Sequence, residues 1–276
     1  MLWGTTGTAQ ALAPDGASPL AVGALRLLVG GAALLGFLFL RRPAPGTQTA
    51  GRLPGGPVFL AAGCMAAYQV LFFAGVARTG VAVGTIVGIG SSPVLAGLLG
   101  FLFRGERPGW RWGAATALAV AGCALLALAG KEIDIDLGGM LLAVGAGGAY
   151  ATFSLASKGM LERHPVEQVM AVVFGLGALI LAPLLLVEDT SWLADPRGIG
   201  VTAWLGLAAT ALAYSLFGQG LRLTQVATAV TLSLAEPLTA GTLGVALLGE
   251  QITPASAAGI ALIFSGLVVL SIPAKR

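Results

Sequence analysis

The sequence SSPVLAGLLGFLFRGE at residues 91–106 returns in altered form as AEPLTAGTLGVALLGE at residues 235–250. An offset of 144 positions aligns the two stretches without a gap. The aligned pairs are Pro93 with Pro237, Gly97 with Gly241, Gly100 with Gly244, Gly105 with Gly249, and Glu106 with Glu250. The same offset also aligns Arg78 with Arg222 and Gly122 with Gly266. A constant offset of this length indicates an internal repeat that spans about half of the chain.

The composition places this repeat in a membrane. Of the 276 residues, 57% are hydrophobic and only 10% are charged, whereas soluble domains have about 25% charged residues. The net charge of +3 is too small to indicate a nucleic-acid partner. Cys64 and Cys123 lie in apolar segments far apart, so we expect neither a disulfide nor a cysteine metal site. The sequence therefore predicts an all-α integral membrane protein with the lipid bilayer as its surroundings.

Apolar runs between charged or Pro/Gly-rich breaks predict ten transmembrane helices, because each needs about 20 residues to cross roughly 30 Å of hydrocarbon. The predicted spans are 1–13, 18–40, 56–77, 80–103, 110–129, 138–158, 166–187, 199–221, 224–248 and 254–273. The first covers only about 20 Å, so either residues are missing before Met1 or the helix enters low in the bilayer. No basic region precedes it, so we do not expect a signal peptide.

The basic residues predict the orientation. With the N-terminus in the cytoplasm, eleven Lys and Arg residues fall in inner connections and only Arg78, Lys131 and Arg197 fall in outer ones. This bias is typical of the positive-inside rule, and an even number of spans puts both termini inside. We expect a multi-pass protein of a bacterial inner membrane.

The repeat divides the ten spans into two halves, residues 1–130 and 131–276. Because five is odd, the second five-helix repeat must be inverted relative to the first. Inverted repeats are typical of secondary transporters, whose binding sites lie near mid-membrane between the repeats. We therefore expect one membrane domain with a central cavity and alternating access.

Several short strings resemble the drug/metabolite transporter superfamily, and most closely its EamA-type ten-helix exporters. They are Trp3-Gly4-Thr5-Thr6, Pro19 with Arg26-Leu27, Ser91-Ser92-Pro93-Val94 with Gly105-Glu106-Arg107, and Ala235-Glu236-Pro237 with Gly249-Glu250 and Gly259. The resemblance covers essentially the whole chain, although the short first helix departs from the pattern. It implies export of a small-molecule substrate such as an amino acid. In one branch, the substrates are aromatic amino acids and cationic drugs such as methyl viologen.

Two charged residues fall inside predicted spans, where a charge costs about 2.5–3.5 kcal/mol at a helix centre. Glu236 could contact a substrate ammonium or exchange a coupling proton; the alternative is a neutral carboxyl group hydrogen-bonded between helices. Arg26 lies about eight residues into its span, so its guanidinium could reach the outer interface or pair between helices. The alternative for Arg26 is a contact with a substrate carboxylate or phosphate.

Pro93 and Pro237 occupy aligned positions inside predicted spans. Each removes a main-chain hydrogen bond, which frees the carbonyl group four residues earlier and tends to kink the helix. The freed carbonyls and nearby hydroxyls predict a polar patch in each half, with the prolines as hinges. The patch consists of the freed main-chain carbonyl groups of Ile89 and Ser233 together with polar side chains. These side chains are the hydroxyl groups of Ser91, Ser92 and Ser233 and the carboxyl group of Glu236.

Polar and aromatic side chains inside other spans complete the predicted substrate cavity. Trp3, Thr6 and Gln10 share one helical face. The further candidates are Tyr68, Phe72, Tyr150 and Tyr214. Such rings could stack on a planar or cationic substrate, although interface belts and helix packing are commoner roles for single aromatic residues.

Small and charged residues at other positions predict packing and helix ends. Gly80, Gly84 and Gly88 recur at every fourth position, which favours close helix contact. Glu106 and Glu250 follow the aligned spans and are expected to anchor helix ends or to form gate ion pairs, with anchoring the commoner role.

Several chemistries are excluded by what the sequence lacks. The one histidine, His164, lies in a connection, so we expect no intramembrane metal site. No phosphate-binding GxxxxGK[ST] loop occurs, so we expect no cofactor and no ATP hydrolysis. Glu236 could support proton coupling, but facilitated efflux would need no coupled ion. An integral-membrane enzyme acting on lipid-linked substrates and a passive channel are the competing interpretations. The sequence leaves the oligomeric state open.

Overall fold

The computed structural model describes residues 1–40, 51–128, 136–248 and 253–272, and these residues form helices and connections without a β-strand. The predicted all-α class is therefore confirmed for the described residues. Seven helical segments among them are long and apolar enough to cross a bilayer. They are Pro19–Leu40, Gly55–Gly80, Val83–Arg104, Leu137–Leu161, Val166–Leu186, Pro196–Leu223 and Pro254–Ser271.

The first half contains two hairpin-like pairs and a short entry helix. Its elements are η1 (Leu2–Gly4), α1 (Thr5–Ala11), α2 (Pro19–Leu40), α3 (Gly55–Arg104) and α4 (Trp110–Leu128). α3 doubles back at Gly80, whose φ of +77° and ψ of 160° suit glycine and few other residues. Gly80 is thus a turn, and its predicted place in a packing ridge is wrong. Gly84 does pack closely, since a Cβ there would lie 2.8 Å from the Cα of Val76.

The second half contains three interrupted spans. Its elements are α5 (Leu137–Leu161), α6 (Val166–Leu181), η2 (Ala182–Leu186), η3 (Ser191–Ala194), α7 (Pro196–Gly206), η4 (Leu207–Leu212), α8 (Ala213–Leu223), α9 (Val226–Leu232), α10 (Ala235–Leu248) and α11 (Pro254–Ser271). η4 is a π-helical turn that joins α7 and α8 into one 28-residue rod. The predicted single helix over 224–248 is divided at Ser233 and Leu234, so that prediction is wrong in detail.

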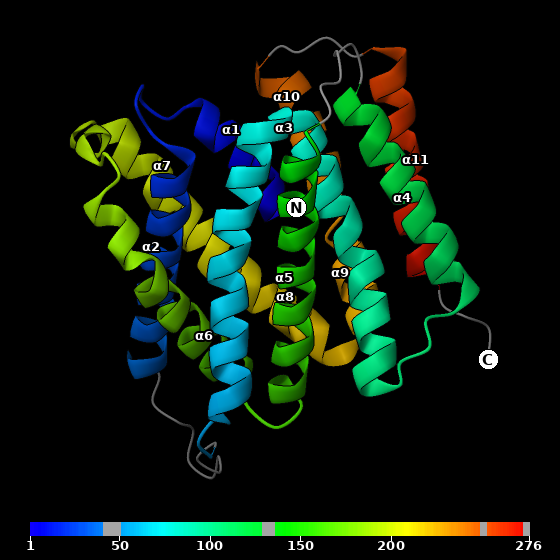
Figure 1. Ribbon diagram of the computed structural model, residues 1–276, viewed down its shortest axis with the longest axis horizontal. Helices are drawn as coiled ribbons and strands as arrows, with labels where there is room; N and C mark the ends of the chain where they lie inside the picture. Colours follow the sequence, from blue (N-terminus) through cyan, green and yellow to red (C-terminus); the bar gives the residue numbers. More distant parts are fainter. Residues whose placement is uncertain (41–50, 129–135, 249–252, 273–276) are drawn as a thin grey trace.

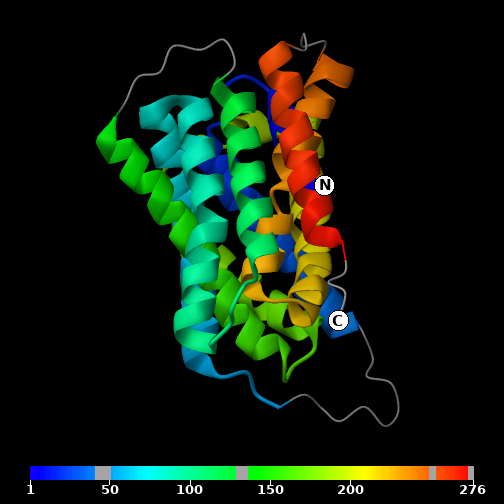
Figure 2. The same cartoon turned by 90° about the vertical axis from the view of Figure 1, so that its right-hand side faces the viewer.

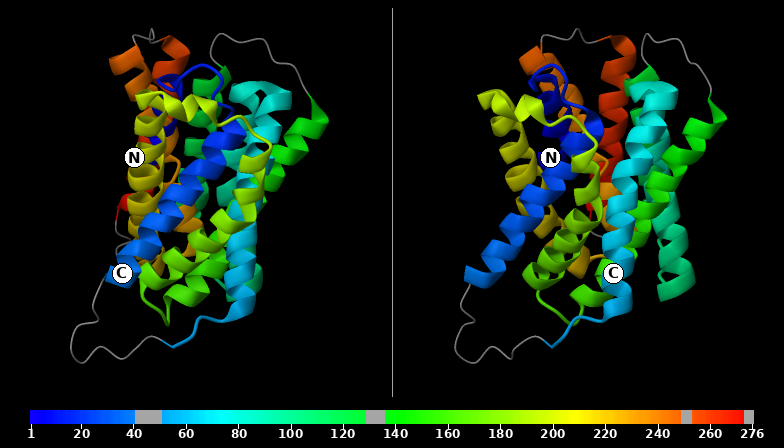
Figure 3. Two further views of the ribbon diagram at one scale, coloured as in Figure 1. Left: turned by 90° about the vertical axis from the view of Figure 1, so that its left-hand side faces the viewer. Right: turned by 60° about the vertical axis from the view of Figure 1, so that its left-hand side comes forward.

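Neighbouring helices come from both halves of the chain. α2 packs along α6 and the π-helical turn η4, as Figure 3 shows from the left-hand side. α4 and α11 lie side by side at the opposite edge (Figure 2). Glycine permits this contact, because a Cβ at Gly122 would lie 2.5 Å from the carbonyl oxygen of Gly259. The largest fully buried side chains include Phe153 and Phe174, at the centre of the main core.

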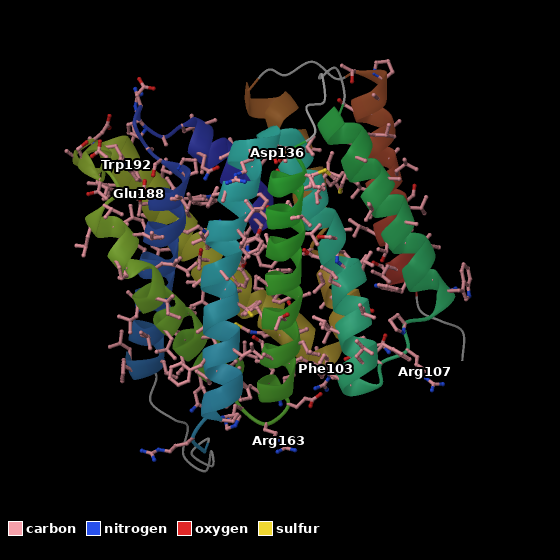
Figure 4. All side chains as sticks on the ribbon, viewed as in Figure 1. Phe103, Arg107, Asp136, Arg163, Glu188 and Trp192 are labelled. Atoms are coloured by element: carbon pink, nitrogen blue, oxygen red, sulfur yellow. The ribbon has the colours of Figure 1, made fainter. Side chains whose placement is uncertain are left out.

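The two ends of the bundle differ in charge, and Figure 4 shows Arg107 and Arg163 at one end and Asp136 and Glu188 at the other. We call these the basic end and the acidic end. Asp136 caps α5 at the acidic end by accepting a hydrogen bond from the main-chain nitrogen of Gly139 (3.1 Å). There too, hydrogen bonds from Ser191 lower the pKa of Asp189 below its ordinary value.

Candidate functional site

A small cavity in the middle of the bundle is lined by both halves of the chain. Its lining residues are Trp3, Thr6, Arg26, Tyr68, Ile89, Ser92, Tyr150, Tyr214, Ser233 and Glu236. They project from η1, α1, α2, α3, α5, α8 and the junction of α9 with α10. The structure therefore brings together the predicted cavity residues, except Gln10, Phe72 and Ser91. The cavity volume is about 40 Å³, and one water molecule needs about 10–15 Å³.

The interruption between α9 and α10 places Ser233 and Glu236 at the cavity wall. Pro237 lies in the first turn of α10 and has no N–H group to donate to the carbonyl oxygen of Ser233. The main-chain nitrogen of Glu236 donates to that oxygen instead (2.9 Å). The Ser233 hydroxyl donates to the carbonyl oxygen of Val230 (2.6 Å). A span broken in this way presents main-chain and side-chain polar groups to a cavity rather than to lipid.

The aligned proline of the first half is placed differently. α3 continues through Pro93, and its only residue with non-helical φ and ψ is Gly80. The hydroxyl of Ser92 donates to the carbonyl oxygen of Gly88 (2.8 Å), while Ile89 lines the cavity. Among the described residues, the helix is thus interrupted next to Pro237 but not next to Pro93. The hinge role of the two prolines stays a prediction.

Arg26 lies within the bundle rather than at its surface. Its side chain lines the cavity and the residue is 8% exposed. Its Nε donates to the hydroxyl of Thr210 (3.3 Å), and this hydroxyl donates to the carbonyl oxygen of Leu205 (2.8 Å). The geometry matches pairing between helices and not a guanidinium that reaches the outer interface.

Thr210 was not among the residues predicted from the sequence. Thr210 lies in the π-helical turn η4, and no sequence pattern distinguished that turn from the helix on either side. A Cβ at Gly30 would lie 2.5 Å from the Cγ2 of Thr210. Gly30 on α2 was the one signal of this close approach, because only glycine lets the two backbones come so near.

The cavity wall holds opposite charges and an unused hydrogen-bonding group. Arg26 and Glu236 both line it, yet no salt bridge joins them in the described part of the chain. The indole nitrogen of Trp3 is buried without a hydrogen-bond partner. A buried polar atom without a partner costs free energy, so this group is available to a bound molecule. Among the described residues, no three His, Cys, Asp or Glu side chains gather as a metal site requires.

Aromatic rings surround the charged groups. Trp3 contacts Tyr214 with ring centroids 4.8 Å apart and Phe217 at 5.5 Å. Tyr68 contacts Tyr150 at 5.6 Å and stacks on Phe72 at 5.7 Å. Rings from four separate helical elements thus form one continuous cluster, in which Phe72 lies behind Tyr68 and outside the cavity lining.

The remaining two predicted cavity residues have other positions. Ser91 faces α5, where a Cβ at Gly147 would collide with the Ser91 hydroxyl oxygen. That hydroxyl donates to the carbonyl oxygen of Gly88 (3.2 Å). Gln10 is half-buried on α1 and is absent from the cavity lining. Ser91 faces a packing contact because it is one residue, or about 100° of helix rotation, away from Ser92.

A polar network joins the two halves at the basic end. Glu106 accepts from the main-chain nitrogen of Val226 (2.9 Å) and from Nε of Arg104 (3.3 Å). Arg104 also forms a salt bridge with Glu162 at the end of α5. The partner position predicted for Glu106, Glu250, lies outside the described residues. The network thus joins the ends of α3 and α5 to the start of α9.

Nearby, Lys158 is 8% exposed and its Nζ donates to the carbonyl oxygen of Arg222 (3.0 Å). Because Arg222 lies in the last turn of α8, this bond satisfies one of the carbonyl groups that a helix leaves unpaired at its C-terminus. The Nζ of Lys158 also lies 4.0 Å from the Oε1 of Glu162. The ends of α3, α5, α8 and the start of α9 are therefore held together at the basic end.

Comparisons with known proteins agree with this architecture. The chain is 48% identical over 274 residues to the uncharacterized transporter YwfM of Bacillus subtilis (strain 168), covering 99% of this chain and 91% of that protein. It is 27% identical over 208 residues to the probable terminal-alkyne amino-acid exporter of Streptantibioticus cattleyicolor, covering 75% and 69% of the two chains.

A shorter match joins the chain to the threonine/homoserine exporter RhtA of Escherichia coli (strain K12), with 32% identity over 159 residues, 55% of this chain and 51% of that protein. A solved crystal structure with 24% identity shares the fold, with a TM-score of 0.83 over 98% of this chain and 92% of that chain. The EamA-like transporter family matches residues 1–128 and 137–272. Because these two matches cover nearly the whole chain, the protein belongs to the EamA-like transporter family.

Proposed function

We propose that this protein is a secondary transporter, not an enzyme, that exports amino acids with aromatic or other amphipathic side chains by alternating access around the central cavity. The observation that carries the proposal is the cavity wall itself. A carboxylate, Glu236, and a guanidinium, Arg26, face the same small space without pairing with each other. A zwitterion supplies an ammonium group for the first and a carboxylate for the second.

The aromatic cluster suits the rest of such a substrate. Trp3, Tyr68, Tyr150 and Tyr214 present ring faces and edges at the cavity, where they would stack on a planar or apolar side chain. The unpartnered indole nitrogen of Trp3 adds a donor. Two relatives named as exporters of amino acids, one of terminal-alkyne amino acids and one of threonine and homoserine, support the same substrate class.

The proposed architecture is ten membrane-spanning helices in two inverted five-helix repeats, residues 1–130 and 131–276. In Figure 1, α2 descends where its counterpart α6 ascends, and α4 ascends where its counterpart α11 descends. At the offset of 144, the turn at Gly80 aligns with the extended Thr224 between α8 and α9. The two family matches also meet near the proposed junction of the repeats.

The proposed location is a bacterial inner membrane with the basic end and both termini in the cytoplasm. The positive-inside rule supports this orientation, because Arg104, Arg107, Arg163 and Arg222 belong to connections at the basic end. In the described conformation, the network of Glu106, Arg104 and Glu162 would then lie at the cytoplasmic face. The cavity is too small for an amino acid, so transport requires the two repeats to separate around it.

Glu236 is also the proposed site of proton coupling. It lies beside the break between α9 and α10, and its carboxyl group could bind either a proton or a substrate ammonium in each cycle. Competition for one carboxylate would couple the two fluxes. One charge moved through 100 mV supplies about 2.3 kcal/mol, which exceeds the roughly 1.4 kcal/mol per tenfold concentration gradient.

The test is counterflow of labelled amino acids in liposomes that contain the purified protein. We expect counterflow of one or more of phenylalanine, tryptophan, threonine and homoserine, and we expect net transport to depend on the pH gradient. Glu236→Gln should abolish the pH dependence and retain counterflow only at a raised KM, because the amide no longer offers a negative charge to the substrate ammonium, while Asp15→Asn, an exposed carboxylate on a connection, should change neither. Ion conductance without any counterflow would identify a channel and overturn the proposal. Unchanged pH dependence in Glu236→Gln would remove that residue from coupling.

A further inference from the structure

A second hollow lies at the basic end, between the start of α3 and the end of α5, and its volume is about 680 Å³. It is separate from the central cavity, with which it shares no lining residue. Its lining includes Arg52, Gly56, Leu60, Leu155, Arg163 and His164. We call it the basic groove.

The basic groove has an apolar wall and a cationic rim. Leu60 and Leu155 project from the spans, and Leu60 is 51% exposed. Arg52 and Arg163 lie in the connections before α3 and after α5, and Figure 4 shows Arg163 at the lower extreme of the bundle. His164 adds a ring whose Nδ1 is buried and has no hydrogen-bond partner.

The charge at this rim is not balanced within the groove. None of the described residues that line it is acidic. Glu162 is adjacent in sequence, but its carboxylate pairs with Arg104 and lies near Lys158, on the side of the network at the basic end. A groove with guanidinium groups on the connections and leucine side chains on the adjoining helices is complementary to an amphipathic anion.

We propose that the basic groove binds an anionic phospholipid, with the headgroup phosphate between Arg52 and Arg163 and one acyl chain against Leu60 and Leu155. Arginine suits the phosphate because its planar guanidinium donates two parallel hydrogen bonds. Basic pockets between membrane helices on the cytoplasmic side suit anionic headgroups for the same reason. The inference does not depend on the transported substrate, because the basic groove and the central cavity are different sites.

The test is titration of the purified full chain in detergent with phosphatidylglycerol or the neutral phosphatidylcholine, followed by native mass spectrometry. We expect preferential retention of phosphatidylglycerol. The double variant Arg52→Gln/Arg163→Gln should weaken this retention by about tenfold or more. The control Arg107→Gln/Arg197→Gln removes the same net charge from exposed positions outside the groove and should bind as the unaltered chain does. Equal binding of the two lipids, or equal losses in both double variants, would overturn the proposal.

Two further measurements separate a lipid from a soluble anion. Glycerol phosphate and inorganic phosphate should compete poorly, because they lack the acyl chain; competition as strong as that of the lipid would overturn the proposal. Gly56→Phe should block the groove, while Gly55→Phe, its neighbour outside the lining, should not. Both positions have open space around an added Cβ, so both variants are expected to fold. Full lipid binding by Gly56→Phe would contradict the placement of the acyl chain.

Discussion

The carboxylate of Glu106 accepts a hydrogen bond from the main-chain nitrogen of Val226 at 2.9 Å, across 120 positions of sequence. Glu106 follows α3 of the first half, and Val226 begins α9 of the second half. Arg104, which donates to Glu106 and pairs with Glu162, extends the connection to α5. Charge-assisted bonds thus join helices of the two halves at the basic end.

Glu106→Ala should favour opening at the basic end. Loss of a hydrogen bond to a charged group is worth about 1.5–3 kcal/mol, so the open population should rise on the order of tenfold. Ser233→Cys in a chain with Cys64→Ala and Cys123→Ala would report this as faster labelling by a membrane-impermeant thiol reagent from that side. Arg107→Gln, a neighbouring exposed charge, is the control. Identical labelling rates for Glu106→Ala and the control would show that the Glu106 hydrogen bonds do not hold the basic end closed.

Thr210→Val should impair transport through Arg26. The variant keeps the shape of the side chain and removes the hydroxyl that accepts from the Arg26 Nε, so the guanidinium loses its orientation. We expect kcat/KM for counterflow to fall about tenfold, in line with a charged hydrogen bond. Thr202→Val on the same rod is the matched control, because the Thr202 hydroxyl is buried without a partner and its removal should be neutral or stabilising. Similar losses in both variants would count against a role for the Arg26 contact.

Gly31→Ala should destabilise the contact between α2 and α6. Its Cβ would lie 2.8 Å from the carbonyl oxygen of Phe174, a backbone atom that cannot move without shifting α6. Overpacking of this kind costs about 1–3 kcal/mol, which thermal unfolding in detergent would register. Gly36→Ala, on the same helix with open space around the added Cβ, should be neutral or stabilising because alanine favours helix. The packing argument fails if Gly31→Ala unfolds at the temperature of Gly36→Ala or above.

Pro93→Ala and Pro237→Ala should differ in their effect on stability. Pro93 is inside the continuous α3, so alanine would supply an N–H group to the carbonyl oxygen of Ile89 and should raise the melting temperature. Pro237 lies in the first turn of α10, where proline is tolerated, so its replacement should change the melting temperature less. If both act as hinges, each variant should lower kcat more than it raises KM in counterflow. A change confined to KM would count against the hinge role.

Seven of the ten predicted spans match helical segments that are long and apolar enough to cross a bilayer, because the bilayer imposes a length and a polarity on each span. The predicted spans 1–13, 110–129 and 224–248 have no such counterpart among the described residues. α2 begins at Pro19 and ends at Leu40, within one residue of the predicted 18–40. Most of the cavity was also predictable, since a polar or aromatic side chain inside a span is stable only when it faces protein or water. Trp3, Tyr150 and Glu236 are side chains of this kind inside predicted spans, and the structure places them at one cavity.

Errors arose where local patterns had two structural solutions. Gly80 fits both a close-packed ridge and a turn with positive φ, and the pattern of glycines at every fourth residue favoured the ridge. Ser91 and Ser92 are equally polar, but only Ser92 faces the cavity because the rotation of α3 about its axis is set by contacts with α5. Trp112 and Thr231, joined by a hydrogen bond of 2.9 Å, lay in apolar segments without a pattern that singled them out.

By itself, the sequence determined the all-helical membrane class, the repeat and the residues that needed a protein environment, because hydropathy and span length are properties of contiguous residues. Only the tertiary structure decided which of these residues meet. The bond between Arg26 and Thr210 joins residues 184 positions apart, and the break before α10, the network at Glu106 and the basic groove likewise depend on neighbouring helices. Such contacts are set by how far each helix is rotated and displaced when its small residues pack against the next, which no single segment encodes.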